Sequence, residues 1–168
     1  MTQLNRRMVV IAIILGTFLA ALDSTIVGTS MPTIIGELGG LSLYSWVFSA
    51  YLLTSTTTVP MYGRLADLYG RKPLVLIATA LFVGGSMLCG VAQSMPQLIL
   101  FRALQGLGAG GIFPVTYTIV GDLFKIEERA KMEGILSAVW GSSAIAGPTV
   151  GGAIVQYVGW RWVFYVNV

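Results

Sequence analysis

The chain has 168 residues, of which 55% are apolar and only 10% are charged, and its mean hydropathy is +0.81. A soluble domain carries about 25% charged residues, so this chain lacks the polar surface that a soluble fold requires. With no histidine and a single cysteine, it offers no ligand set for a zinc cluster or a haem and no disulfide framework, and we predict neither a metal nor a cofactor.

Long apolar intervals separate the charged residues, and five of them are long enough to cross a bilayer if Asp23 and Arg102 are counted as inclusions. A spanning helix takes about 20 predominantly apolar residues. The first interval is too long for the apolar region of a signal peptide, so we expect it to be retained. The predicted spans are residues 8–35, 46–62, 74–92, 98–121 and 135–158, followed by the start of a sixth at 162–168. The predicted fold class is therefore all-α, a polytopic transmembrane helix bundle in a lipid bilayer.

The positions of the basic residues predict the orientation of the bundle, because cytoplasmic connections are enriched in lysine and arginine. With the N-terminus in the cytoplasm, every Lys and Arg except Arg102 and Arg161 lies on the cytoplasmic side. Trp46, Trp160 and Trp162 then fall where an external aromatic belt would lie. Because topology explains the net charge of +3, we expect a multi-pass protein of the cell (inner) membrane and no nucleic-acid partner.

Two charged residues lie inside predicted spans. Asp23 lies 16 residues after Arg7 and 14 before Glu37, which places it near the bilayer midplane. A carboxylate there costs about 2.5–3.5 kcal/mol on insertion scales, so we predict that Asp23 binds and releases a proton; the alternative is a structural aspartate satisfied by nearby hydroxyl groups or another helix. Arg102 keeps its proton. It could hold an anion, pair with or tune Asp23, or extend to the external interface, and Gln105 lies on the same side of its helix.

The connection between the second and third spans reads GRLADLYGRKP over residues 63–73. Its length predicts a tight turn between antiparallel spans, and its basic residues fit an ordinary cytoplasmic turn. An ordinary turn does not require Asp67 among the basic residues or the paired glycines Gly63 and Gly70. These residues therefore mark the turn as a candidate functional segment.

Small residues recur every four positions in the fifth span, where Gly147 and Gly151 form one row and Pro148 and Gly152 the adjacent row. Such spacing makes a flat face for close helix packing. Pro148 removes a backbone hydrogen bond and is expected to bend the helix.

Several of these segments resemble signature motifs of the major facilitator superfamily, and they occur in the proper order. GRLADLYGRK (63–72) resembles the turn between helices two and three of that family. LDSTIVGTSMPTI (22–34) is similar to the helix-one motif of its drug:proton antiporters, and RALQGLGAGG (102–111) is similar to the helix-four arginine motif. GPTVGG (147–152) is similar to the helix-five antiporter motif, and GWRWVFYVN (159–167) resembles the start of helix six in the fourteen-helix branch.

The resemblance implies a proton-coupled antiporter that exports small, lipophilic or cationic compounds such as drugs by alternating access. In such a protein, proton coupling or substrate binding involves Asp23, Arg102 and Gln105. The cytoplasmic gate, whose charges latch the outward-facing state through Asp67, Arg71 and Asp122, comprises Gly63, Arg64, Asp67, Gly70, Arg71, Lys72 and Asp122. Many members have a basic residue where this chain has Leu68. The antiporter motif, expected to pack against a helix of the other half, comprises Gly147, Pro148, Gly151 and Gly152.

Such transporters bind substrate between two six-helix halves. Residues 1–168 are therefore expected to form the N-terminal transmembrane domain of a longer transporter, truncated at helix six and completed by a missing C-terminal half. An uptake porter of the same superfamily would usually lack the GPTVGG pattern. A polytopic membrane enzyme would need clustered nucleophiles or bases, and a non-transporting receptor or scaffold would leave Asp23 unexplained. We therefore predict a non-enzymatic exporter that exchanges a small molecule for protons, with the substrate and the choice between twelve and fourteen helices left open.

Overall fold

The computed structural model describes residues 3–168, and for residues 3–7 it describes only the backbone. This part of the chain is helical apart from short connections and contains no strand, which confirms the predicted all-α fold class. The elements are α1 (Gln3–Leu38), the 3-10 turn η1 (Leu41–Leu43), α2 (Tyr44–Tyr69), α3 (Arg71–Gly90), α4 (Met95–Leu123), α5 (Ile126–Tyr157) and the one-turn α6 (Trp162–Tyr165).

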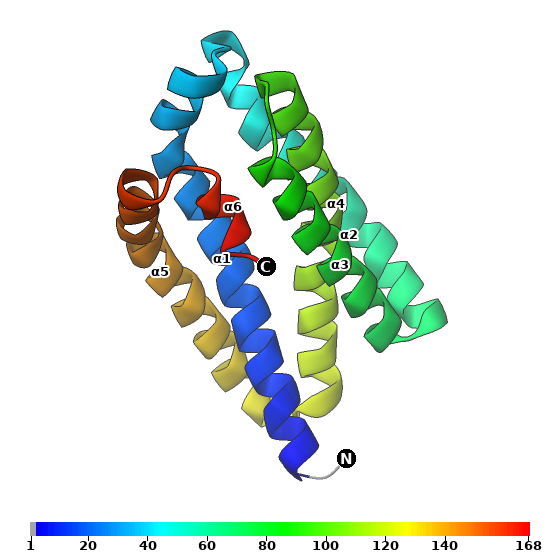
Figure 1. Ribbon diagram of the computed structural model, residues 1–168. Helices are drawn as coiled ribbons and strands as arrows, with labels where there is room; N and C mark the ends of the chain where they lie inside the picture. The colour runs from blue at the N-terminus through cyan, green and yellow to red at the C-terminus, as the bar shows by residue number, and fades with distance from the viewer. Residues whose placement is uncertain (1–2) are drawn as a thin grey trace.

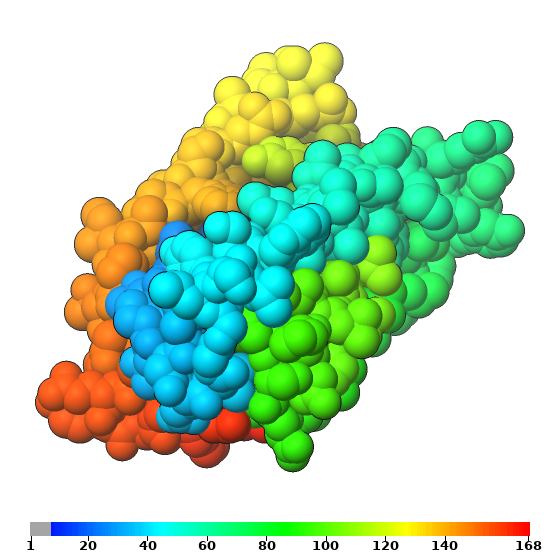
Figure 2. All heavy atoms as spheres, turned by 90° about the horizontal axis from the view of Figure 1, so that it is seen from above, coloured from blue at the N-terminus to red at the C-terminus, as the bar shows by residue number. Residues whose placement is uncertain are grey.

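The long helices form two groups (Figure 1). α1 packs along α5, while α2 and α3 both pack against α4, and these pairs make the most extensive contacts. The short α6 and the end of the chain lie between the two groups, in contact with α1 and α3. Figure 2, which views the bundle from above, shows the α1–α2 connection between the α5–α6 turn on one side and the α3–α4 connection on the other.

Four of the described helices, α1, α3, α4 and α5, have the length and apolar composition of membrane spans. α2 has 26 residues and is also long enough, but its middle reads TSTTT over residues 54–58. Four of these five hydroxyl groups donate to backbone carbonyls about one turn earlier, as from Thr57 Oγ1 to the Leu53 oxygen at 2.6 Å. Because these four are satisfied within the helix, the lower hydropathy of α2 is compatible with the predicted span.

Most ends of the helices extend beyond the predicted spans, above all at the α2–α3 connection and at the start of α5. α2 continues through Asp67 to Tyr69 and α3 begins at Arg71, so the connection is the single residue Gly70. Gly70 has φ 89°, in the left-handed region that favours glycine. α5 begins at Ile126 rather than near residue 135. Hydropathy marks the part of a helix that fits the hydrocarbon core, whereas the helical backbone continues into charged segments.

α4 is the central helix and the most buried of the four apolar spans. Its glycines allow the neighbouring helices to approach closely. A Cβ at Gly106 would lie 2.6 Å from the Tyr51 carbonyl oxygen of α2, and one at Gly108 would lie 2.8 Å from the Phe82 Cα of α3. A larger residue at either position would push a neighbouring helix away, so the small residues of α4 set the depth of its polar side chains in the bundle.

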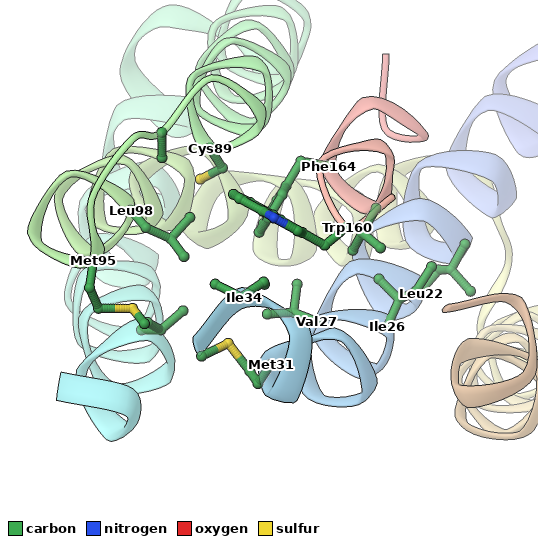
Figure 3. Close-up of a cluster of buried hydrophobic side chains, with 13 residues drawn as sticks. Leu22, Ile26, Val27, Met31, Ile34, Cys89, Met95, Leu98, Trp160 and Phe164 are labelled. Carbon is green, nitrogen blue, oxygen red and sulfur yellow. The ribbon is translucent and has the colours of Figure 1, made fainter. Parts of the chain in front are cut away.

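A cluster of buried apolar side chains holds the start of α6 (Figure 3). Trp160 and Phe164 are buried, and their ring centroids lie 6.2 Å apart in an edge-on arrangement. They pack among side chains of α1, α3 and α4, including Val27 and Leu98. Trp160 Nε1 also donates to Glu37 Oε2 at 2.8 Å. These contacts anchor the α5–α6 turn to the rest of the bundle.

Candidate functional site

The Asp23 carboxylate lies inside the bundle, in the middle of α1, and is fully buried. Its Oδ2 accepts a hydrogen bond from Arg102 Nη1 at 2.8 Å. Its Oδ1 accepts two more, from Gln105 Nε2 at 2.9 Å and from Asn167 Nδ2 at 2.8 Å. Three side-chain donors, one of them cationic, thus surround the Asp23 carboxyl group in a closed polar site.

Arg102 and Gln105 reach this site from one face of α4. Arg102 is 1% exposed, and its Nη1 also donates to Gln105 Oε1 at 2.7 Å. The guanidinium carbon lies 4.0 Å from the centroid of the Tyr51 ring of α2, a cation–π geometry. The sequence left several roles open for Arg102, and the structure shows one of them, an ion pair with Asp23. The side chain does not extend to the external surface.

Asn167 and Ser86 are members of the site that the sequence analysis did not identify. Asn167 Nδ2 donates to Ser86 Oγ at 2.9 Å as well as to Asp23, and Ser86 Oγ donates to the Phe164 carbonyl oxygen at 2.7 Å. A signal was available for Asn167, because it is a polar residue inside the sixth predicted span, where polar side chains need partners. No comparable signal marks Ser86, since serine is common in membrane helices.

The site is assembled from five parts of the chain. α1 supplies Asp23, α2 supplies Tyr51, α3 supplies Ser86, α4 supplies the arginine and the glutamine, and the segment after α6 supplies Asn167. The Cys89 thiol of α3 also lies 3.7 Å from the Gln105 amide oxygen. Among buried side-chain nitrogen and oxygen atoms of the described residues, only Arg102 Nε and Thr17 Oγ1 lack a hydrogen-bond partner. The polar site is thus almost fully satisfied, and its members hold several helices in one arrangement.

A second charge cluster lies where α2 meets α3. Arg71 Nη1 donates to Asp67 Oδ1 at 2.8 Å, and Arg71 Nε donates to Asp122 Oδ2 at 3.2 Å. Arg71 also donates to the Ala66 carbonyl oxygen at the end of α2. The cluster therefore joins the ends of α2, α3 and α4. Its side chains are partly or largely exposed, so the pairs are open to water and each is weak on its own.

The remaining residues of the predicted gate motif lie around this cluster without entering it. Arg64 and Lys72 are exposed, Gly63 is half-buried within α2, and Gly70 forms the one-residue connection. A Cβ at Gly63 would meet nothing within 4 Å. The paired glycines therefore differ in their use, since only Gly70 has a backbone conformation that favours glycine.

The glycine row of α5 packs against α1. A Cβ at Gly147 would lie 2.7 Å from Thr25 Cβ, and one at Gly151 would lie 2.7 Å from Ile26 Cγ1. The expectation that this row meets a helix of the other half is wrong for these two glycines, because α1 of the same bundle already occupies their surface. Gly152, in contrast, has open space, and Pro148, within α5, is exposed.

An aromatic pocket of about 250 Å³ lies beside the polar site. Phe113 of α4 and Trp140 of α5 line it, with ring centroids 5.5 Å apart and planes inclined at 35°. Tyr51, which covers the Arg102 guanidinium, also lines this pocket, together with Ser55 of α2. The pocket thus offers apolar ring faces and a few hydroxyl groups, and it shares one side chain with the charged site.

Comparison with known proteins shows which family the chain resembles. The model of the Major Facilitator Superfamily matches residues 13–168. The chain is 47% identical to the multidrug transporter protein MdtP of Bacillus subtilis (strain 168), over 98% of this chain and 30% of that protein. It is 44% identical to multidrug resistance protein 3 of the same organism, over 99% of this chain and 32% of that protein. It is 46% identical to the efflux pump FUS6 of Gibberella moniliformis (strain M3125 / FGSC 7600), over 95% of this chain and 28% of that protein.

The fold is also found among solved structures. A bacterial homolog of the human lysosomal transporter Spinster, in an inward-facing and occupied conformation, matches with a TM-score of 0.81 and 21% identity, over 98% of this chain and 38% of that chain. Its inward-facing and unoccupied conformation matches with a TM-score of 0.79. The chain thus has the fold of the N-terminal half of such a transporter, and it spans about 30% of the length of the curated relatives it matches.

Proposed function

The chain belongs to the Major Facilitator Superfamily, and from that premise we propose that it is the amino-terminal part of a proton-coupled antiporter that exports small lipophilic or cationic compounds. It is a multi-pass membrane protein of a family of transporters rather than of enzymes. The names of its relatives, multidrug transporters and efflux pumps, support export. In this proposal a C-terminal half completes the transporter, and the bundle lies in the cell membrane with its N-terminus in the cytoplasm.

The observation that carries the proposal is the fully buried carboxylate of Asp23, paired with Arg102. Arginine retains its proton in proteins, so the aspartate is the member of the pair that can gain and lose a proton. A protonated carboxyl group no longer attracts the guanidinium as an ion does. Proton binding at Asp23 therefore loosens the contact between α1 and α4, and formation of the ion pair expels the proton.

This coupling links protonation to conformation. A state in which α1 and α4 are held by the ion pair is favoured when Asp23 is ionised, and a state in which they separate is favoured when it is protonated. A cationic substrate that approaches Asp23 competes with the proton for the same carboxylate. That competition is the property an antiporter needs, because the site then holds either the proton or the charge of the substrate.

The aromatic pocket beside Asp23 and Arg102 is the proposed contribution of this half to substrate binding. Ring faces of Phe113 and Trp140 suit flat lipophilic compounds, and aromatic faces also attract cations. Tyr51 lines the pocket and contacts Arg102, so an occupant of the pocket would contact a side chain that packs on the ion pair. The second half of the transporter would provide the facing wall.

The Arg71 cluster is proposed to latch one of the two states. It joins the ends of three helices through exposed ion pairs, each of which contributes about 0–1 kcal/mol. A latch of this strength can shift the populations of two conformations without locking either of them. It lies at the end of the bundle that the basic residues predict to be cytoplasmic.

The proposal is tested with Asp23→Asn in the full-length protein in proteoliposomes, by measuring efflux of a cationic dye driven by a proton gradient. Asparagine keeps the shape of the side chain but cannot bind a proton, so gradient-driven efflux should be lost. Glu127→Gln, an exposed carboxylate in the first turn of α5, is the matched control and should behave as wild type. Gradient-driven efflux by Asp23→Asn at the wild-type rate would refute the proposed role of Asp23.

A further inference from the structure

Asn167, in the segment after α6, is the donor to the Asp23 carboxylate that does not come from α4. It is 4% exposed, and its Nδ2 atom donates one hydrogen bond to Asp23 Oδ1 at 2.8 Å and another to Ser86 Oγ at 2.9 Å. A side-chain amide nitrogen carries two hydrogens, so both are used. The two residues that meet, Asn167 and Asp23, are separated by 144 positions in the sequence.

Ser86 determines which end of the Asn167 amide faces Asp23. A serine hydroxyl carries a single hydrogen, and that of Ser86 is donated to the Phe164 carbonyl oxygen at 2.7 Å. The Ser86 oxygen can therefore only accept from Asn167, which requires the nitrogen of the amide rather than its oxygen. The same nitrogen then presents its second hydrogen to Asp23. Without Ser86, the amide could turn and present its oxygen instead.

The packing around α6 keeps this arrangement in place. Phe164, whose carbonyl accepts from Ser86, is fully buried in the apolar cluster beneath the α5–α6 turn. Ser86 is fully buried in α3. Asn167 is thus tied to α3 and α6, whereas the other two donors to Asp23 both come from α4. The carboxylate is thus held both by α4 and by the segment after α6, which Ser86 ties to α3.

We propose that Asn167, oriented by Ser86, is a positioning residue that favours the ionised form of Asp23 and so sets the pH range of proton-coupled transport. This inference rests on the proposed function, because it concerns the proton site of the same transporter. A hydrogen bond to an ionised carboxylate favours that form over the protonated one. Loss of the Asn167 donor makes Asp23 hold its proton up to a higher pH.

The other groups around Asp23 do not link its proton binding to the positions of α3 and α6. The titratable and charged groups that face it among the described residues are Arg102 from α4, Tyr51 from α2 and Cys89 from α3. Arg102 stays charged, and tyrosine and cysteine are neutral near pH 7. Gln105 is held by its bond from Arg102 on its own helix. Asn167 is therefore the donor whose position depends on α3 and α6.

The test is the pH dependence of gradient-driven efflux by the full-length transporter in proteoliposomes. Asn167→Leu removes the donor at similar volume, and the pH of half-maximal efflux should rise by about one to two units, the size expected for one hydrogen bond to a charged group. Ser86→Ala keeps Asn167 but frees its amide to turn, and the midpoint should rise in the same direction. Gln156→Leu, the same loss of an amide on the exposed face of α5, should keep the wild-type midpoint.

The outcomes separate this inference from the proposed function. If gradient-driven efflux by Asp23→Asn equals that of wild type, the proposed role of Asp23 in proton coupling is refuted, and the inference about Asn167 is refuted with it. If Asp23→Asn loses coupling while Asn167→Leu and Ser86→Ala keep the wild-type midpoint, only the role of Asn167 is overturned. Should Asn167→Leu fail to fold, Ser86→Ala decides, since an unchanged midpoint in that variant overturns the proposal and an upward shift supports it.

Discussion

Replacing Arg102 with methionine in the full-length protein is expected to lower the free energy of unfolding by about 3–5 kcal/mol, the usual effect of breaking a buried ion pair. Arg102 is 1% exposed, its partner Asp23 is fully buried, and their atoms Nη1 and Oδ2 lie 2.8 Å apart. The substitution leaves a carboxylate with no counter-charge inside the bundle. Gln105 and Asn167 still donate to it, so the loss should fall toward the lower end of this range.

The assay is denaturant unfolding of the purified protein in lipid–detergent micelles, followed by tryptophan fluorescence. Arg161→Met is the matched control, because Arg161 pairs with Glu37 at a similar distance of 3.0 Å but the two side chains are 42% and 52% exposed. Its effect should be about 1 kcal/mol or less. The double variant Asp23→Asn with Arg102→Met removes both buried charges and should recover most of the stability lost in the single variant.

Two results would refute this reasoning. The first is that Arg102→Met lowers the free energy of unfolding by no more than Arg161→Met does. Breaking the buried ion pair would then cost no more than breaking an exposed one. A double variant as unstable as Arg102→Met alone would mean that the loss comes from packing of the arginine stem rather than from the unpaired carboxylate.

Two further substitutions test the helix-end cluster and the α1–α5 contact in the full-length protein. Asp67→Asn should lower the maximal transport rate more than the substrate affinity, because it removes one of the two carboxylates that bind Arg71. Transport kinetics in proteoliposomes measure both quantities, and a loss of affinity alone would contradict the prediction. Gly151→Leu should destabilise the protein by about 1–3 kcal/mol and let protons leak, because a Cβ there would lie 2.7 Å from Ile26 Cγ1 of α1. Gly152→Leu, which has open space, is the control, and equal pH decay of substrate-free vesicles for both variants would argue against a seal between α1 and α5.

The sequence by itself determined the number and order of the helices. Each membrane span must be largely free of charge over the thickness of the bilayer, so the spans could be predicted from the long intervals between charged residues, including α2, whose hydropathy is lower. Counting residues along a helix of known rise predicted Asp23 near the middle of its span, and the structure has it buried in the middle of α1. Arg102 was also identified from the sequence, because charged residues inside membrane spans are rare and mark functional sites. It also missed the true start of α5 at Ile126, because a helix end outside the apolar core has no hydropathy signal.

Only the tertiary structure decided which side chains meet. Arg102 had several possible roles, and the structure pairs it with Asp23 across 79 positions of sequence. Gly147 was expected to meet the other half of a transporter, whereas it packs on α1. Asn167 and Ser86 joined the site without having been predicted. The physical reason is that apolar spans look alike in sequence, while their contacts depend on how each helix is rotated about its own axis and on where small residues let two backbones approach. That choice is made by the packing of the whole bundle.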